Sequence, residues 1–218
     1  MQTSEAVREQ MIEQQIRPWD VLDSRVLETL RSIRREAFAP DEHRALAFVD
    51  TEIPLPHGEH MLAPKLEGRL LQALALRRDD SALQIGTGSG FVAACLGRLT
   101  ARVVSYEIHE DLAAVASDRL RDQGCHGNIE VVAGDIRTKK PVGEFDAVAV
   151  CGSVADYRRE WTALLKPGGR LFVVTGTAPI MEARLLVRTG TDDFREESLF
   201  DTMIDPLHGF EAKPGFAF

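Results

Sequence analysis

The stretch Ala82-Leu83-Gln84-Ile85-Gly86-Thr87-Gly88-Ser89-Gly90 decides the predicted fold, because it joins a short apolar run to a loop with three glycines. Residues 82–85 predict a strand, and the residues after Gly90 predict a helix. Glycines at such a junction let a ligand come close to the backbone, and free N–H groups of the helix start lie at the carboxyl edge of the sheet. The stretch predicts a ligand-binding turn in an open α/β fold, although a plain tight turn would use the same residues.

Strands and helices alternate downstream of this loop. We predict strands at 102–106, 129–133, 145–151 and 170–175, and helices at 109–123 and 156–165. The strands are continuously apolar, which indicates a mostly parallel sheet with helices on both faces. After Pro179 the apolar residues alternate over 181–189, which predicts a last strand paired antiparallel with 194–203.

The first third of the chain reads as a helical extension. Apolar residues at helical spacing predict a helix over 7–16 that ends at Arg17-Pro18, and a second helix over 21–33 with Asp20 as its N-cap. Prolines break 38–64 into turns, and a helix follows from Pro64 to Leu74. We predict a single domain over 1–218, in which the extension 1–63 forms the acceptor-site wall and 64–218 form the cofactor-binding core.

Composition narrows the class of protein. The chain has 218 residues, 44% of them hydrophobic, and a formal charge of −8, so we expect neither nucleic acid nor membrane as a partner. No stretch approaches the roughly 20 apolar residues of a membrane span, and the three cysteines form no Cys-x-x-Cys pair. These features predict a cytoplasmic protein, a monomer or weak homo-oligomer, whose partners are small molecules and proteins.

Two acidic residues follow strands at the edge where the glycine loop lies. Glu107 ends the strand after the loop, where a carboxylate accepts from ribose hydroxyls, and Asp135 follows the third strand, within reach of an adenine amino group. Each is also an ordinary helix-start or turn residue. Phe91 occupies the third position of a dinucleotide fingerprint, which disfavours an NAD-dependent oxidoreductase. The Gly-x-Gly-x-Gly spacing instead resembles the S-adenosylmethionine loop of class I methyltransferases, a Rossmann-like fold, as does the stretch 164–171.

A more specific resemblance lies upstream of the loop. Residues 35–40, 47–50 and 53–56, together with Gly58 and Pro64, are similar to the protein-L-isoaspartate O-methyltransferase family. The resemblance covers about 7–175, with a weaker echo at 204–207. It implies a protein-repair enzyme that transfers a methyl group from S-adenosylmethionine to the carboxylate of isoaspartyl residues without a metal. It also implies a protein or peptide substrate held by the loop 38–64.

The resemblance assigns residues to the two halves of the site. The implied cofactor-binding residues are Gln84, Gly86, Thr87, Gly88, Ser89, Gly90, Glu107, Ile108, Asp135, Ile136 and Cys151. The family's acceptor-contacting serine is replaced by Leu62, its usual acidic residue by Gln84, and the glycine after its third-strand aspartate by Ile136. We name His60, Thr51 and the departed position Leu62 as catalytic candidates, because His57, His60 or Thr51 can supply the lost donor.

A carboxylate acceptor is already ionised at neutral pH, so methyl transfer to it needs positioning and no general base. We predict no metal, because the pair His57-x-x-His60 lacks the third close ligand of a zinc site. Two alternatives stay open: a methyltransferase of the same fold with another acceptor, and a non-catalytic protein that binds cofactor or peptide.

Overall fold

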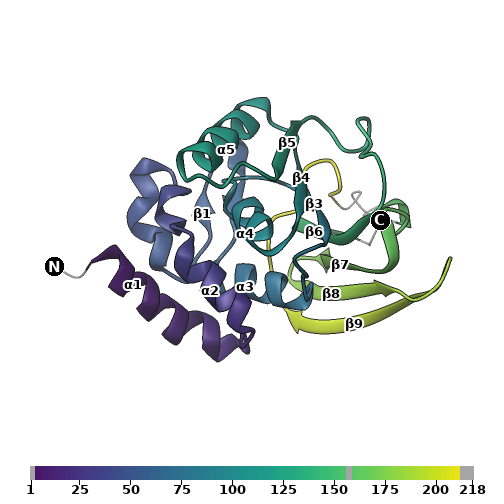
Figure 1. Cartoon of the computed structure of the whole chain (residues 1–218), viewed down its shortest axis with the longest axis horizontal. Helices are drawn as coiled ribbons and strands as arrows, with labels where there is room; N and C mark the ends of the chain where they lie inside the picture. Colours follow the sequence, from purple (N-terminus) through teal and green to yellow (C-terminus); the bar gives the residue numbers. More distant parts are fainter. Residues whose placement is uncertain (1–2, 156–158, 212–218) are drawn as a thin grey trace, which may run out of the picture.

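A seven-stranded sheet forms the centre of the molecule in the computed structural model, which describes residues 3–155 and 159–211 (Figure 1). Its strands are β3 (Ser81–Ile85), β4 (Arg102–Glu107), β5 (Ile129–Ala133), β6 (Phe145–Val154), β7 (Leu165–Thr177), β8 (Ile180–Arg188) and β9 (Phe194–Asp201). They follow the order β5-β4-β3-β6-β7-β8-β9. All pairs from β5 to β7 are parallel, whereas β7–β8 and β8–β9 are antiparallel. The predicted mostly parallel sheet with an antiparallel end is confirmed.

The longest helices flank the glycine loop and the sheet. They are α1 (Ser4–Met11), α2 (Ser24–Ser32), α3 (Pro64–Ala73), α4 (Phe91–Leu99) and α5 (Glu110–Asp122). The first continues without a break through a π-helical turn over Ile12–Ile16 and a 3-10 turn over Arg17–Trp19. Pro18 therefore lies at the start of the 3-10 turn and not beyond the helix. At the start of this turn, the missing N–H of proline removes no hydrogen bond within the turn.

The predicted start of the second helix is wrong by three residues. Asp20 lies in the left-handed region with φ 58° as the C-cap of the preceding 3-10 turn, whereas the side chain of Asp23 accepts from the N–H groups of Arg25 and Val26. The cause lies in α3, because Gln72 Oε1 accepts from the N–H of Asp23 at 2.9 Å and its Nε2 donates to the carbonyl of Asp20 at 2.6 Å. This contact holds the connection extended until Asp23.

The predicted helix 156–165 is largely wrong in its second half. Residues 156–158 lie outside the described residues, and the helix α6 covers only Arg159–Thr162. Leu165 already pairs with Phe145 as the first residue of β7, and the register shifts before Ala147 pairs with Arg170. The Pro167-Gly168 turn is therefore an irregularity inside the strand pairing and not a separate loop.

Alternate residues of the central strands enter two separate apolar cores. Ala147 and Ala149 of β6 pack with the helices α1 to α4, while Val148 and Val150 of the same strand pack against the opposite face. That second face is covered by Trp161 of α6 together with Phe210 of the C-terminal segment. The sheet is therefore buried on both sides, as its continuously apolar strands predict.

The segment 38–64 is ordered by short turns and one hairpin. Its 3-10 turns are Asp41–Phe48 and Pro56–Gly58, and another 3-10 turn, Arg35–Ala37, directly precedes the segment. Its hairpin pairs β1 (Ile53–Pro54) with β2 (His60–Met61). Ile53 is 0% exposed and Met61 3% exposed, so the hairpin is held by apolar residues in the core. The hairpin brings residues 53–56 against the glycine loop, where a Cβ on Gly88 would lie 3.4 Å from Leu55 Cδ1.

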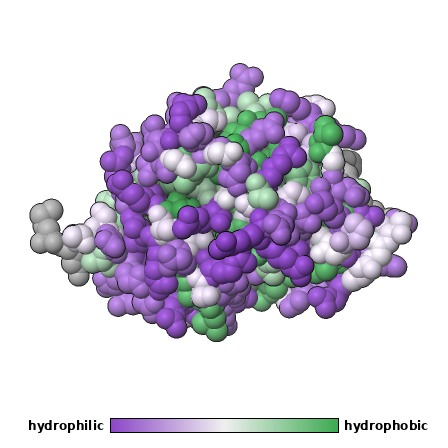
Figure 2. Space-filling model, viewed as in Figure 1, coloured by the Kyte–Doolittle hydropathy of each residue, from purple (hydrophilic) through white to green (hydrophobic). Residues whose placement is uncertain are grey.

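Hydrophilic residues cover most of the face shown in Figure 2, and apolar residues form only small patches there. Within the described part of the chain, every helix is too short or too polar to cross a lipid bilayer.

Candidate active site

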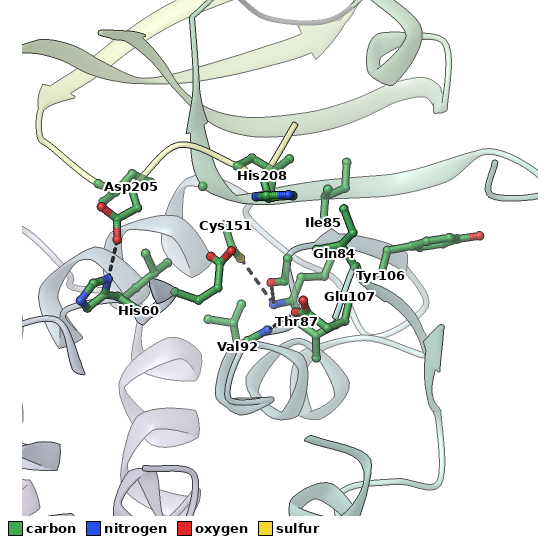
Figure 3. Close-up of a pocket in the computed structure, with 18 of the residues that line it drawn as sticks. His60, Gln84, Ile85, Thr87, Val92, Tyr106, Glu107, Cys151, Asp205 and His208 are labelled. Atoms are coloured by element: carbon green, nitrogen blue, oxygen red, sulfur yellow. Dashed lines mark hydrogen bonds and ion pairs between the residues drawn. The ribbon is translucent and has the colours of Figure 1, made fainter. Parts of the chain in front are cut away.

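One cleft lies at the carboxyl edge of the parallel strands, between the glycine loop, the hairpin β1–β2 and the segment 204–210 (Figure 3). It holds about 910 Å³ of empty space, including the solvent at its mouth. The predicted residues that line it are His60, Leu62, Gln84, Gly86, Thr87, Gly88, Ser89, Glu107, Ile108, Asp135, Ile136 and Cys151. Twelve of the predicted positions, from five separate segments, thus meet in one cavity.

The glycine loop rests on a buried chain of hydrogen bonds. Gln84 Nε2 donates to the carbonyl of Gly86 at 2.8 Å, and Gln84 Oε1 accepts from the hydroxyl of Ser105 at 3.1 Å. The hydroxyls of Ser105 and Thr87 lie 2.6 Å apart. Gln84 thus holds the loop with both its amide N–H and its amide oxygen. An ionised acidic residue at this position could accept hydrogen bonds but could not donate one to the carbonyl of Gly86.

Glycine is required where the loop approaches the cleft. Gly86 and Gly88 have φ of 87° and 52°, which other residues rarely adopt. Gly90 does not line the cleft; it is the N-cap of α4 with φ 89°, and a Cβ there would lie 3.2 Å from the Cβ of Ala116. Gly90 therefore allows α4 and α5 to pack closely.

Glu107 is held in the cleft by backbone groups alone. Its Oε2 accepts from the N–H of Gly88 at 2.8 Å and its Oε1 accepts from the N–H of His109 at 3.2 Å. The residue is 4% exposed. A carboxylate fixed at the end of β4, beside the glycine loop, fits the recognition of a ribose diol.

Asp135 and Cys151 line the same cleft as Glu107. Both carboxylate oxygens of Asp135 accept from the Arg137 side chain, at 2.6 to 2.9 Å, and these hydrogen bonds lower the pKa of Asp135 below its usual value. Arg137 also donates to the carbonyl of Gly209 at 2.8 Å, which ties this edge to the C-terminal segment. Burial raises the pKa of the Cys151 thiol to about 12, so this partly exposed thiol, which accepts from Gln84 Nε2 at 3.4 Å, is neutral.

A buried guanidinium anchors the acceptor side of the cleft. Arg35 is 1% exposed and donates to the carbonyls of Ala47 and Leu62, both at 2.6 Å, and to Glu67 Oε2 at 2.8 Å. Burial raises the pKa of the Glu67 carboxyl, while the charge of Arg35 opposes that rise. Leu62 is 7% exposed, and its backbone is fixed by this contact whatever side chain it carries.

The histidines of the pair His57-x-x-His60 point to different partners. His57 Nε2 lies 2.9 Å from the Asp111 carboxylate, and its ring stacks on His109 at 4.1 Å. His60 Nδ1 lies 2.5 Å from Asp205 Oδ2 at the acceptor end, away from Gln84 and Glu107 (Figure 3). His60 is thus the histidine that belongs to the cleft.

The structure brings Glu52, Asp205 and His208 into the cleft, none of which the sequence singled out as site residues. Burial raises the pKa of Glu52, and the negative charge of Asp205 adds to that rise. Thr51 does not line the cleft, whereas its neighbour Glu52 does. Thr51 lies in a tight turn, in which its N–H donates to the carbonyl of Val49 at 2.8 Å. The echo of the family at 204–207 is the signal that could have found Asp205.

Comparison with known proteins identifies the family. Residues 6–207 match the model of the protein-L-isoaspartate(D-aspartate) O-methyltransferase family. The chain belongs to this family. A protein-L-isoaspartate O-methyltransferase from Brucella anthropi is 32% identical over 98% of this chain and 99% of its own length, and one from Rhodopseudomonas palustris is 35% identical over 92% and 93%.

Solved structures agree on the fold. A Plasmodium falciparum chain of the same name, solved in complex with S-adenosyl-L-homocysteine, superposes with a TM-score of 0.78 at 19% identity, over 95% of this chain and 99% of that one. Membership of the family makes the chain an S-adenosylmethionine-dependent methyltransferase with a class I fold. An oxidoreductase and a non-catalytic binding protein are thereby set aside.

Proposed function

We propose that this chain methylates the free carboxylate of isoaspartyl residues in proteins and peptides. The observation that carries the proposal is one continuous cleft, in which the glycine loop and Glu107 lie at one end and the hairpin residues His60 and Leu62 lie at the other. Family membership supports the same acceptor, because the matched model bears the name of this reaction.

The residues of the cofactor end fit S-adenosylmethionine. Glu107 offers its carboxylate to the ribose hydroxyls, Gly86 and Gly88 leave the backbone open to the amino-acid part, and Ile108 and Ile136 offer apolar contacts to the adenine. Asp135 reaches an adenine amino group only by sharing its oxygens with Arg137. The bound cofactor supplies a methyl group on a sulfonium.

At the acceptor end, the task of the chain is to orient an ionised carboxylate and exclude water from it. A carboxylate oxygen forms the new bond to the methyl carbon while the electron pair of the carbon–sulfur bond returns to sulfur, so no proton is transferred. The serine hydroxyl of the family is absent at Leu62. We assign its role to His60, whose Nδ1 faces Asp205 and whose Nε2–H donates to the acceptor.

Two synthetic peptides of equal sequence, one isoaspartyl and one aspartyl, test the proposal. We expect a base-labile methyl ester on the isoaspartyl peptide alone, and a rate reduced about 10²–10³-fold in His60→Ala, the value of one aligned donor. Neither peptide being methylated, while S-adenosylhomocysteine still binds by calorimetry, would refute the isoaspartyl assignment.

A methyltransferase for a neutral acceptor is the second candidate. The cleft is lined by Glu52, Glu59 and Asp205, and none of the described lining residues is lysine or arginine. These charges favour an amine or hydroxyl over an anion, and His60 would then accept the proton of the nucleophile. A base-stable methylated product would identify this reaction.

A further inference from the structure

We propose that Glu52, His60 and Asp205 form a binding site for a divalent first-row transition-metal ion such as Zn²⁺, at the acceptor end of the cleft. One potential ligand atom from each of the three side chains lies within 4.8 Å of the other two. In a filled site, ligand atoms about 2.1 Å from a tetrahedral Zn²⁺ lie about 3.4 Å apart. His60 Nδ1 and Asp205 Oδ2 lie only 2.5 Å apart, so these two atoms separate by about 1 Å when an ion takes the place of the hydrogen between them, while Glu52 moves closer by a similar amount.

The backbone that carries the three ligands is already fixed. Glu52 directly precedes β1, and His60 lies in β2, paired with Pro54 in the hairpin that buries Ile53 and Met61. The site therefore joins two ligands from one rigid hairpin.

Asp205 comes from the opposite wall of the cleft. Its carbonyl accepts from the N–H of Ser153 at 2.8 Å, and the carbonyl of Ser153 accepts from the N–H of Leu207 at 2.8 Å. These contacts hold the segment of Asp205 against the end of β6. The proposed site therefore uses His60 without His57, and the fold supplies Glu52 and Asp205 as the other two ligands.

The electrostatic setting favours a cation. Two carboxylates face one imidazole, and the described lining residues of the cleft include no lysine or arginine to balance them. The Glu52 carboxylate accepts no hydrogen bond from the described residues, although the side chain is partly buried. An ion would supply the partner that this half-buried charge lacks.

The donor set selects the kind of ion. One imidazole and two carboxylates suit Zn²⁺, Mn²⁺ or Co²⁺. By contrast, Ca²⁺ takes six to eight oxygen ligands, and Cu⁺ prefers sulfur ligands. Three protein ligands leave a position open toward the cleft, where water completes the coordination.

Calorimetric titration of the metal-free full chain with ZnCl₂ tests the site. We expect one equivalent to bind, and the same titration with CoCl₂ to give visible d–d absorption. His60→Gln and Asp205→Asn should each weaken binding at least about tenfold. The matched control is His57→Gln on the same loop, which should bind as the parent does, and S-adenosylhomocysteine binding verifies that each variant is folded.

Absence of binding heat and of a Co²⁺ spectrum in the parent overturns the proposal, as does equal Zn²⁺ affinity in parent and His60→Gln, or loss of binding in His57→Gln alone. These measurements use neither cofactor turnover nor a peptide, so they decide the metal site even if the proposed isoaspartyl reaction fails.

Discussion

Leu62→Ser places a hydroxyl where the family has one, and the structure sets both its cost and its benefit. The parent side chain is 7% exposed in the core, while its carbonyl accepts from Arg35 independently of the side chain. Removing a buried leucine costs about 2–5 kcal/mol. For a chain of 218 residues, that lowers Tm by roughly 4–20 °C.

The rate of methyl transfer should move in the opposite direction. One well-aimed donor is worth at most about 10²-fold here, because His60 already donates in the proposed arrangement. The assay is the initial rate of base-labile ester formation on an isoaspartyl peptide, measured below the Tm of every variant. Leu62→Ala is the matched control, because it leaves a similar cavity without a hydroxyl, and we expect it to be no faster than the parent.

Equal rates in Leu62→Ser and Leu62→Ala would refute the reasoning, since the hydroxyl would then contribute nothing at this position. If both variants are as fast as the parent, residue 62 does not face the acceptor. A rate gain shared by both would mean that the bulk of leucine blocks the peptide.

The other predictions concern the two ends of the cleft. Glu107→Gln should weaken S-adenosylhomocysteine binding at least about tenfold by calorimetry, because a carboxylate hydrogen bond is worth about 1.5–3 kcal/mol; the exposed Glu130→Gln of β5 is its control, and equal dissociation constants would remove Glu107 from the site. Glu67→Gln leaves the buried charge of Arg35 without its partner and should destabilise the fold by about 3–5 kcal/mol in urea unfolding, so a change within error would show that the pair is not buried as described. At pH 8, Cys151 should react with iodoacetamide at least about 100-fold more slowly than a free thiol, because a pKa of about 12 leaves almost no thiolate; rapid labelling of the folded protein at Cys151, located by mass spectrometry, would contradict the raised pKa.

The sequence predicts those parts of the fold whose pattern is local. The glycine loop, the strand at Ile129–Ala133 and the antiparallel end all follow from short apolar runs and breakers. The start of α2 does not, because Asp20 and Asp23 are equally good caps in isolation and only Gln72, some fifty residues away, decides between them. The end of α6 fails for a similar reason, since Leu165 joins the sheet through Phe145.

The candidate site divides in the same way. The cofactor end could be predicted because strand, loop and helix follow one another along the chain, so spacing alone places Gly88 and Glu107 together. The acceptor end joins residues that lie far apart, such as His60 and Asp205, which are 145 positions apart in the sequence. Nothing in local spacing predicts such a pair, which is why Glu52 emerges only from the folded chain and Asp205 is marked in the sequence only by the family echo at 204–207.

The wall of the cleft formed by 204–210 has a consequence for the order in which the protein becomes active during synthesis. Asp205 is held by Ser153, and Gly209 accepts from Arg137, so these residues close the cavity over elements that the ribosome made much earlier. All seven strands precede this segment along the chain. The first strands of the sheet therefore leave the ribosome long before this segment, and the cleft is complete only when residues 204–210 have joined the folded sheet.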